Sequence, residues 1–231
     1  MLTPSRLAII GDVFADLSAT GLSSLPQWGC DVAVERPINM LAGGSGFNSA
    51  VQLASMQRDP RRGIVTGPAS AGVDVMLYAA LGDDSFANFL QNAAYEMGVN
   101  MQRVRTGPAS GEGEDEIAEA TGTGVCMVLA GYTDSSRTRI DRSFVTHYGV
   151  VAEMRASDLD WQALRDGADH VHISGYYNFK GLHGAEGEAQ TARMLQYVRA
   201  AGVTTSVCAQ FDSSQRWEGN AIPTAMLCVR Y

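Results

Sequence analysis

Short runs of apolar residues alternate along the chain with turns that are rich in glycine and aspartate. The first run, residues 7–10, ends at Gly11 and predicts a buried strand that delivers residues 12–16 to its carboxyl end. A connection rich in glycine, serine and proline follows it. Further apolar or β-branched runs predict strands at residues 32–36, 73–81, 122–131, 143–147, 170–174 and 204–211.

Helical spacing of apolar residues fills most of the intervals between these strands. Helices are predicted directly after the glycines at 43–46, between Asp84 and Gly98, and at residues 160–166 and 188–201. Asp84 is a good N-cap, and Gly98 is a typical helix stop. The repeated alternation of strand and helix indicates an α/β fold with a mostly parallel sheet that is covered on both faces.

Composition narrows the class of protein. The 231 residues are 45% hydrophobic, which is enough for a sizeable core, and the formal net charge is -8. Nucleic acids are held mainly by clustered Lys and Arg, so this acidic chain is not expected to bind them. Its four cysteines form no C-x-x-C pair, and no apolar stretch approaches the roughly 20 residues of a membrane span. The sequence therefore predicts a cytoplasmic protein without membrane contact.

A candidate binding site follows the first strand. Asp16 lies just beyond that strand, and Gly43 and Gly44 precede a helix whose first turn carries Asn48. A carboxylate accepts hydrogen bonds from two hydroxyls, an amide both donates and accepts, and glycine lets a ligand approach the backbone. Asp16, Gly43, Gly44 and Asn48 are therefore predicted to bind a small polyol, a sugar or a nucleoside. A glycine turn between strand and helix also occurs for conformational reasons alone.

Familiar nucleotide motifs are missing around these glycines. The sequence holds no G-x-x-x-x-G-K-[ST] and no H-R-D with D-F-G. A dinucleotide fingerprint needs a third glycine where Ser49 stands, so a Rossmann-type oxidoreductase is the least favoured alternative. His170 and His172 share one side of a predicted strand, but two histidines without a third ligand do not make a metal site.

Five segments, in order, resemble the ribokinase-like (PfkB) carbohydrate and nucleoside kinases. They are G-D-V-F-A-D at 11–16, G-G-S-G-F-N at 43–48, L-G-D-D-S-F at 81–86, R-S-F-V-T-H-Y-G at 142–149 and V-T-T-S-V-C-A-Q-F-D-S-S-Q-R-W at 203–217. In this family the first motif supplies the substrate Asp, which corresponds to Asp16, and the second is the di-glycine signature. Ser45 stands where many members carry Lys.

The resemblance implies a three-layer sandwich with a mostly parallel sheet and a small β lid, the lid coming from segments near 13–40 and 123–147. It also implies a sugar or nucleoside substrate, with ATP and Mg²⁺ beside it. Residues 1–217 would be an incomplete kinase domain that lacks its C-terminal nucleotide-binding part, and residues 218–231 would be a divergent tail.

Two family motifs are absent from this sequence: G-A-G-D, which holds the catalytic Asp, and N-x-x-E, which helps to organise metal and phosphate. A general base is typically worth about 10² to 10⁴ in rate. The resemblance therefore implies a truncated kinase that has no catalytic residue and is inactive as written. The alternative is a non-catalytic descendant that binds a small polyol or a partner. A sheet edge and an apolar face left uncovered would favour a homodimer.

Overall fold

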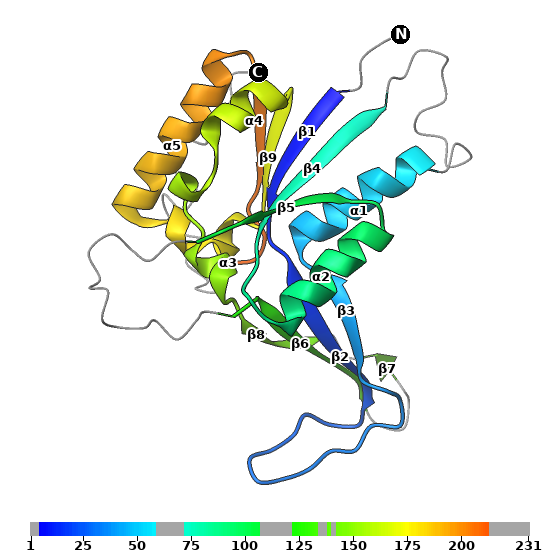
Figure 1. Ribbon diagram of the computed structural model, residues 1–231. Coiled ribbons are helices and arrows are strands. Elements are labelled where there is room, and N and C mark those ends of the chain that lie inside the picture. Colours follow the sequence, from blue (N-terminus) through cyan, green and yellow to red (C-terminus); the bar gives the residue numbers. More distant parts are fainter. Residues whose placement is uncertain (1–4, 59–71, 107–121, 134–137, 140–141, 213–231) are drawn as a thin grey trace.

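The computed structural model describes residues 5–58, 72–106, 122–133, 138–139 and 142–212, and its main feature is a five-stranded parallel sheet (Figure 1). The strand order is β10-β9-β1-β4-β5, so the first strand of the chain lies in the centre, and every neighbouring pair is parallel. The strands are β1 Ser5–Gly11, β4 Val73–Ala80, β5 Asn100–Val104, β9 His170–Ser174 and β10 Thr204–Cys208.

Helices cover both faces of this sheet (Figure 1). One face packs against α1 Ser45–Arg58 and α2 Ser85–Glu96, and the other against α3 Val150–Glu153, α4 Trp161–Gly167 and α5 Gly184–Ala200. Short 3₁₀ turns lie at Ala156–Asp158, Tyr176–Asn178 and Lys180–Leu182. The predicted three-layer α/β architecture is confirmed.

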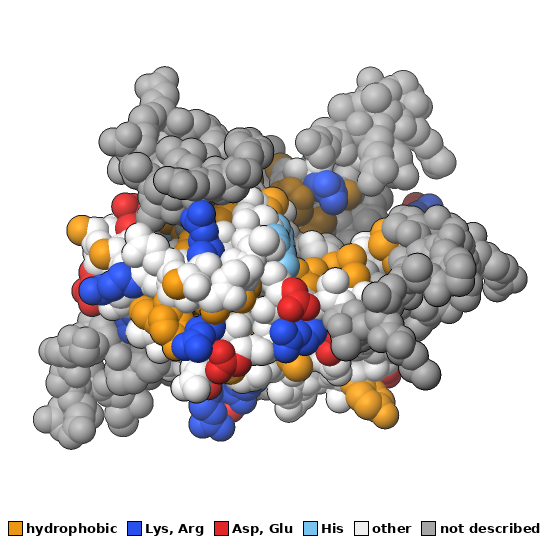
Figure 2. Space-filling model, turned by 90° about the horizontal axis from the view of Figure 1, so that it is seen from above, with side chains coloured by type: hydrophobic (Ala, Val, Ile, Leu, Met, Phe, Trp, Pro, Cys, Tyr) orange, Lys and Arg blue, Asp and Glu red, His pale blue; other side chains and the backbone are white. Residues whose placement is uncertain are grey.

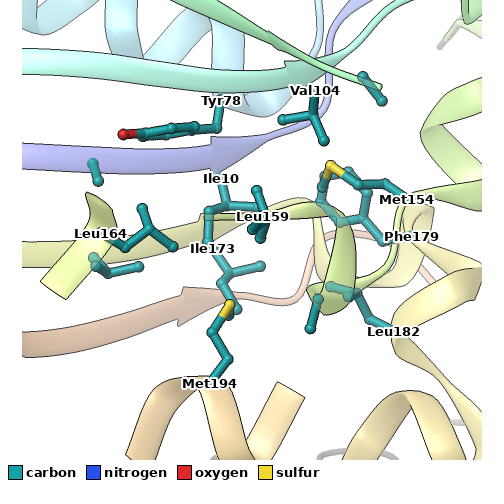
Figure 3. Packing of buried hydrophobic residues seen from close by; sticks show 14 of the residues in the cluster. Ile10, Tyr78, Val104, Met154, Leu159, Leu164, Ile173, Phe179, Leu182 and Met194 are labelled. Carbon is teal, nitrogen blue, oxygen red and sulfur yellow. The ribbon is translucent and has the colours of Figure 1, made fainter. Parts of the chain in front are cut away.

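Neighbouring residues of β1 explain why its sequence is continuously apolar. Ile9 belongs to the core under α1 and α2, whereas Ile10 belongs to the core under α3 to α5. In this second core, Ile10 and Ile173 of the sheet face Met194 of α5 (Figure 3). Both isoleucines of β1 are at most 1% exposed, and each such burial is worth roughly 1.5–3 kcal/mol. A strand that is buried on both faces does not alternate between polar and apolar residues.

A smaller, mixed sheet projects from the carboxyl end of β1 (Figure 1). It holds β2 Phe14–Leu22, β3 Asn39–Gly43, β6 Val125–Thr133, β7 Thr138–Arg139 and β8 Ser143–His147. Strand β2 pairs antiparallel with β3 and parallel with β6, and β8 pairs antiparallel with β6. Only residues 12 and 13 separate β1 from β2, so the first strand of this second sheet continues directly from the centre of the main one.

Asp84 and Thr123 connect the two sheets. The Asp84 carboxylate caps α2 through the amide of Ala87 at 2.8 Å, and it also accepts the Thr123 amide at 2.7 Å and the Thr123 hydroxyl at 2.8 Å. The same hydroxyl accepts the amide of Gly82 at 3.0 Å. Burial opposes ionisation of Asp84, but hydrogen bonds from Thr123 and Ala87 outweigh it and lower its pKa. One side chain thereby fixes the start of α2 against the segment that enters β6.

Most predicted elements are present, but one predicted strand is absent, one strand lies where a connection was predicted, and some boundaries differ. Residues 32–36 form no strand; the edge strand β3 lies at Asn39–Gly43 instead. The predicted connection after Asp16 contains most of β2, which extends to Leu22. Strand β10 ends at Cys208 rather than at 211, because Gln210 has a φ of 64° and leaves the extended conformation. Helix α5 begins at Gly184, one turn earlier than predicted.

The surface near the start of β1 and β4 carries basic and acidic side chains side by side (Figure 2). At this end Arg6 pairs with Asp169 at 3.0 Å, which joins the beginnings of β1 and β9. Both side chains are about half exposed, so the pair contributes little to stability. Within the described residues, no helix is long and apolar enough to cross a membrane.

Candidate functional site

Asp16 lies on β2 of the second sheet, next to the glycines that end β3 and open α1. Its carboxylate is so close to the backbone of Gly43 that a Cβ on that glycine would overlap it. The side chain is partly buried, and among the described residues it has no hydrogen bond or ion pair. Burial, with a smaller repulsion from Asp12, raises the pKa of the Asp16 carboxyl to about 6. A partly buried carboxylate without a partner is the feature expected of a ligand contact.

Gly44 makes the turn between β3 and α1. Its φ is 100°, a conformation that side chains rarely adopt, and a Cβ there would collide with the carbonyl of Asp12. This close approach brings the end of β3 directly over the end of β1. Gly43 lies against Asp16 because β3 pairs with β2, and Gly44 then turns the chain into α1 in a conformation that favours glycine.

Asp12 holds the first turn of α1 in place. Its carboxylate accepts the Ser45 hydroxyl at 2.6 Å and the Gly46 amide at 2.8 Å, and its backbone carbonyl accepts the Phe47 amide at 3.3 Å. The other carboxylate oxygen accepts the side-chain amide of Asn178 at 2.7 Å. Asp12 is only 2% exposed, so these bonds replace the water that burial removes.

This arrangement decides what the glycine turn can bind. The amides of Gly46 and Phe47 are bonded to Asp12, and the amide of Asn48 is bonded to the carbonyl of Gly44 at 3.0 Å. Helix starts bind phosphate through free amides and a positive dipole end. Here the amides are engaged and a carboxylate stands at the helix start, so the turn fits neutral hydroxyls better than phosphate.

Ser45 is part of this support. Its hydroxyl also lies 2.9 Å from the hydroxyl of Ser174, at the end of β9. Sequence reasoning did not find the roles of Asp12, Ser174 and Asn178, because Asn178 is 166 residues away from Asp12 and carries no motif. The one available sequence signal for these three residues was the first aspartate of G-D-V-F-A-D, which is Asp12.

Asn48 takes a different position from Asp16. It is exposed on α1 and borders a groove between that helix and β9, together with Leu7, Ile9, Ser49, Gln52, Leu53 and His172. Among the described residues, no hydrogen bond joins Asn48 to Asp16. The structure thus brings Asp16, Gly43 and Gly44 together. Asn48 lies outside this group, at the edge of the groove between α1 and β9.

Cys126 and Thr146 lie beside Asp16 in the second sheet. Asp16 pairs with Cys126, and Cys126 pairs with Thr146, so the three side chains share one face. The Cys126 sulfur lies 3.3 Å from the Thr146 hydroxyl. Burial raises the pKa of the Cys126 thiol, which therefore stays protonated near neutral pH.

The two histidines of β9 bond to the neighbouring strand β10. His170 Nε2 and His172 Nδ1 each lie 2.7 Å from the Ser206 hydroxyl, and His170 Nδ1 lies 2.7 Å from the Thr204 hydroxyl. Burial lowers the pKa of both imidazoles. The described part of the chain contains no group of three His, Cys, Asp or Glu side chains that could hold a metal ion.

Comparison with known proteins identifies the fold. No family model matches the sequence, and no curated protein sequence matches it. Solved structures do match. An ATP-bound fructokinase from Xylella fastidiosa superposes with a TM-score of 0.59 at 20% identity, over 97% of this chain and 57% of its own. A ribokinase from Giardia lamblia gives a TM-score of 0.60 at 16% identity, over 89% of this chain and 50% of its own.

A third match points the same way. The ribokinase from Cryptococcus neoformans var. grubii, in complex with ADP, gives a TM-score of 0.55 at 18% identity, over 89% of this chain and 49% of its own. The chain therefore has the ribokinase-like fold and spans about half the length of the solved structures that it matches. At these identities the likeness establishes the fold alone.

Proposed function

We propose that this chain binds the polyol acceptor, a sugar or a nucleoside, of a ribokinase-like phosphotransfer reaction. One observation carries the proposal: the Asp16 carboxylate is partly buried, has no partner among the described residues and lies against the glycine turn that opens α1. The fold is that of chains named as fructokinase and ribokinase.

The chemistry of the site suits hydroxyl groups. An ionised Asp16 accepts hydrogen bonds from two neighbouring hydroxyls, and Gly43 and Gly44 leave room for a ring to lie against the backbone. The side-chain amide of Asn48, at the edge of the neighbouring groove, can both donate and accept hydrogen bonds. We propose that the smaller sheet, which carries Asp16, covers the bound acceptor as a lid.

ATP and Mg²⁺ fit the described residues poorly. The first amides of α1 are engaged by Asp12 and Gly44, and no acidic or histidine cluster suits a metal in the described part of the chain. The sequence also contains neither G-A-G-D nor N-x-x-E. We therefore propose acceptor binding without phosphoryl transfer by this chain.

Calorimetric titration of the purified chain with D-ribose, D-fructose and a ribonucleoside tests the proposal. We expect at least one of these to bind with a stoichiometry of one, and we expect Asp16→Asn to weaken that binding by about a hundredfold. Asp31→Asn, an exposed loop aspartate, is the matched control and should bind as the parent does.

A coupled assay for ADP release over the same ligands tests the absence of transfer. We expect no turnover above background in the presence of ATP and Mg²⁺. Robust ADP release that depends on the ligand would show that this chain carries out the reaction and would overturn that part of the proposal.

A further inference from the structure

We infer that the acceptor is a nucleoside, a polyol that carries a flat apolar ring, and not a free sugar. This inference rests on the proposed function, because it concerns the same site around Asp16. It comes from the side chains that share the Asp16 face of the second sheet.

Strand register defines this face. A first row across the sheet runs from Leu41 through Asp16 and Cys126 to Thr146, since each is the direct cross-strand partner of the next. A second row, two residues further along each strand, runs in the same way through Asn39, Ser18, Val128 and Phe144. Cross-strand partners point to the same side of a sheet, so both rows lie on the face of Asp16.

The large side chains on this face are apolar and open to water. Leu41, the direct neighbour of Asp16, is 54% exposed, and Phe144 is 55% exposed. Asp16 separates Leu41 from the other apolar side chains, Cys126, Val128 and Phe144, which adjoin one another on β6 and β8, so apolar side chains flank the single carboxylate on both sides. Exposed apolar side chains gathered beside an unpartnered polar group are typical of a ligand site that is half apolar.

A free sugar does not match such a surface. Hydroxyls surround its ring, and each that loses water needs a polar partner. Beyond Asp16 the two rows offer Ser18, Asn39 and Thr146, and the Thr146 hydroxyl already contacts Cys126. A nucleoside has a polar part and an apolar part, as this face does. Its ribose hydroxyls can bond to Asp16, and its base can pack against Leu41 and Phe144.

Arg142 supports the aromatic part of this surface. Its guanidinium carbon lies 5.6 Å from the centroid of the Phe144 ring, within the range of a cation–π contact. Such a contact restrains the ring, and because Phe144 is still 55% exposed, ring surface remains for an offset or edge-to-face aromatic contact, worth about 0.5–1.5 kcal/mol beyond buried area.

Titration of the whole chain with adenosine and with D-ribose tests the inference, because adenosine carries a base where free ribose carries its anomeric hydroxyl. We expect adenosine to bind at least about tenfold more tightly. Leu41→Ser and Phe144→Ser should each weaken adenosine binding by about three- to tenfold and leave ribose binding unchanged.

Matched controls lie on the same two strands. Met40→Ser and Val145→Ser remove apolar side chains that are 41% and 58% exposed, but these residues point to the opposite face of the sheet. We expect both controls to bind adenosine as the parent does. The milder Phe144→Leu, which keeps an apolar side chain, should show a smaller loss than Phe144→Ser and guards against a folding defect.

The outcomes separate this inference from the proposed function. Equal affinity for ribose and adenosine, or equal losses on both faces of the sheet, would overturn the nucleoside assignment and leave polyol binding in place. Absence of binding by ribose, fructose and adenosine alike would overturn the proposed function itself.

Discussion

Folding places the Asp16 carboxylate in an environment that disfavours its negative charge. A carboxylate that leaves water needs hydrogen bonds or a cation to stay ionised, and here the Asp12 carboxylate repels the charge instead. The resulting pKa of about 6 means that folding alone disfavours the charged form. Residues that are retained in an unfavourable state usually serve a ligand, and substitution can distinguish this case from a structural role.

Asp16→Asn should weaken acceptor binding and at the same time stabilise the free protein at pH 7. Each hydrogen bond to a charged group contributes about 1.5–3 kcal/mol, so losing the carboxylate should lower affinity by about a hundredfold. Removing a partly buried negative charge also removes its desolvation cost, and the melting temperature should rise. Calorimetric titration and thermal melts measure the two effects. A lower melting temperature would instead indicate that Asp16 supports the fold.

Acceptor affinity should depend on pH through Asp16. The ligand prefers the ionised carboxylate, so its affinity should fall about tenfold per pH unit below pH 6 and be constant well above it. Titrations at pH 5 and pH 7.5 measure the difference. Asp16→Asn has no group to titrate here, and a pH profile that survives in this variant would assign the effect to another residue.

The stability of the free protein should show the opposite trend. Because the folded pKa of Asp16 lies above the ordinary aspartate value of 3.8, the folded state binds its proton more tightly than the unfolded state does. The stabilisation is therefore complete below about pH 4 and is lost as the pH rises through about 6. Chemical denaturation of the parent and of Asp16→Asn should give free energies of unfolding that diverge over this interval.

At the scale of elements, α1 depends on a residue outside itself. Its first turn has no acidic residue, and Asp12, at the end of β1, supplies the missing charge and acceptors. Asp12→Ala should leave the Gly46 amide and the Asn178 side chain without partners, and we expect a loss of about 3 kcal/mol in the free energy of unfolding. Urea denaturation measures it. Asp31→Asn, in an exposed loop, should change stability by less than about 0.5 kcal/mol.

The link between the two sheets can be tested at Thr123. Thr123→Val keeps the shape of the side chain but removes the donor to Asp84 and the acceptor for Gly82. Thr123 is only 1% exposed, so we expect a loss of about 1–3 kcal/mol in urea denaturation. Thr123→Ser retains the hydroxyl and should recover most of it. Equal losses in both variants would assign the effect to packing and not to hydrogen bonding.

The accuracy of the sequence predictions differs between elements for physical reasons. Strand β1 and helix α2 carry their own signals, a doubly buried apolar run and an aspartate cap. Strand β2 has the sequence FADLSATGL, whose small and polar residues resemble a loop, and it is extended because β3 and β6 pair with it. The position of β3 likewise depends on its register with β2 and not on the more strand-like residues at 32–36.

The residues of the candidate site also differ in whether the sequence could predict their positions. Asp16 and the glycines belong to two motifs near the start of the chain, so the sequence could predict that they lie close together. The apolar residues Leu41 and Phe144 could not, because their position on the face of Asp16 comes from the register of four strands. The support of Asp12 by Asn178 required the whole fold.

At the scale of the whole molecule, β10 forms one edge of the main sheet. In the described part of the chain it pairs with β9 alone, and its residues include the exposed Cys208. An edge strand with open amides and carbonyls is a site for pairing between chains. The sequence predicts a homodimer, and we expect sedimentation velocity under reducing conditions to show self-association.

Substitution at this edge gives the corresponding control. Cys208→Lys places a charge on β10 and should shift the protein toward monomer, because charged side chains on edge strands oppose pairing. Cys30→Lys makes the same change in an exposed loop and should leave the association unchanged. A monodisperse parent that melts cooperatively as a monomer would contradict the expectation.

The central place of β1 has a consequence for the order in which the chain can fold. Strands β1, β4 and β5 with α1 and α2 are complete once residue 104 has been made, but the other side of β1 waits for His170–Ser174. Pairings between residues so distant in sequence make folding slow. During synthesis the nascent chain therefore carries an apolar strand that is paired with β4 on one side and open on the other while more than sixty residues are added. Protection of that strand on the ribosome, more than the final stability of the sheet, would then limit how much folded protein a cell obtains.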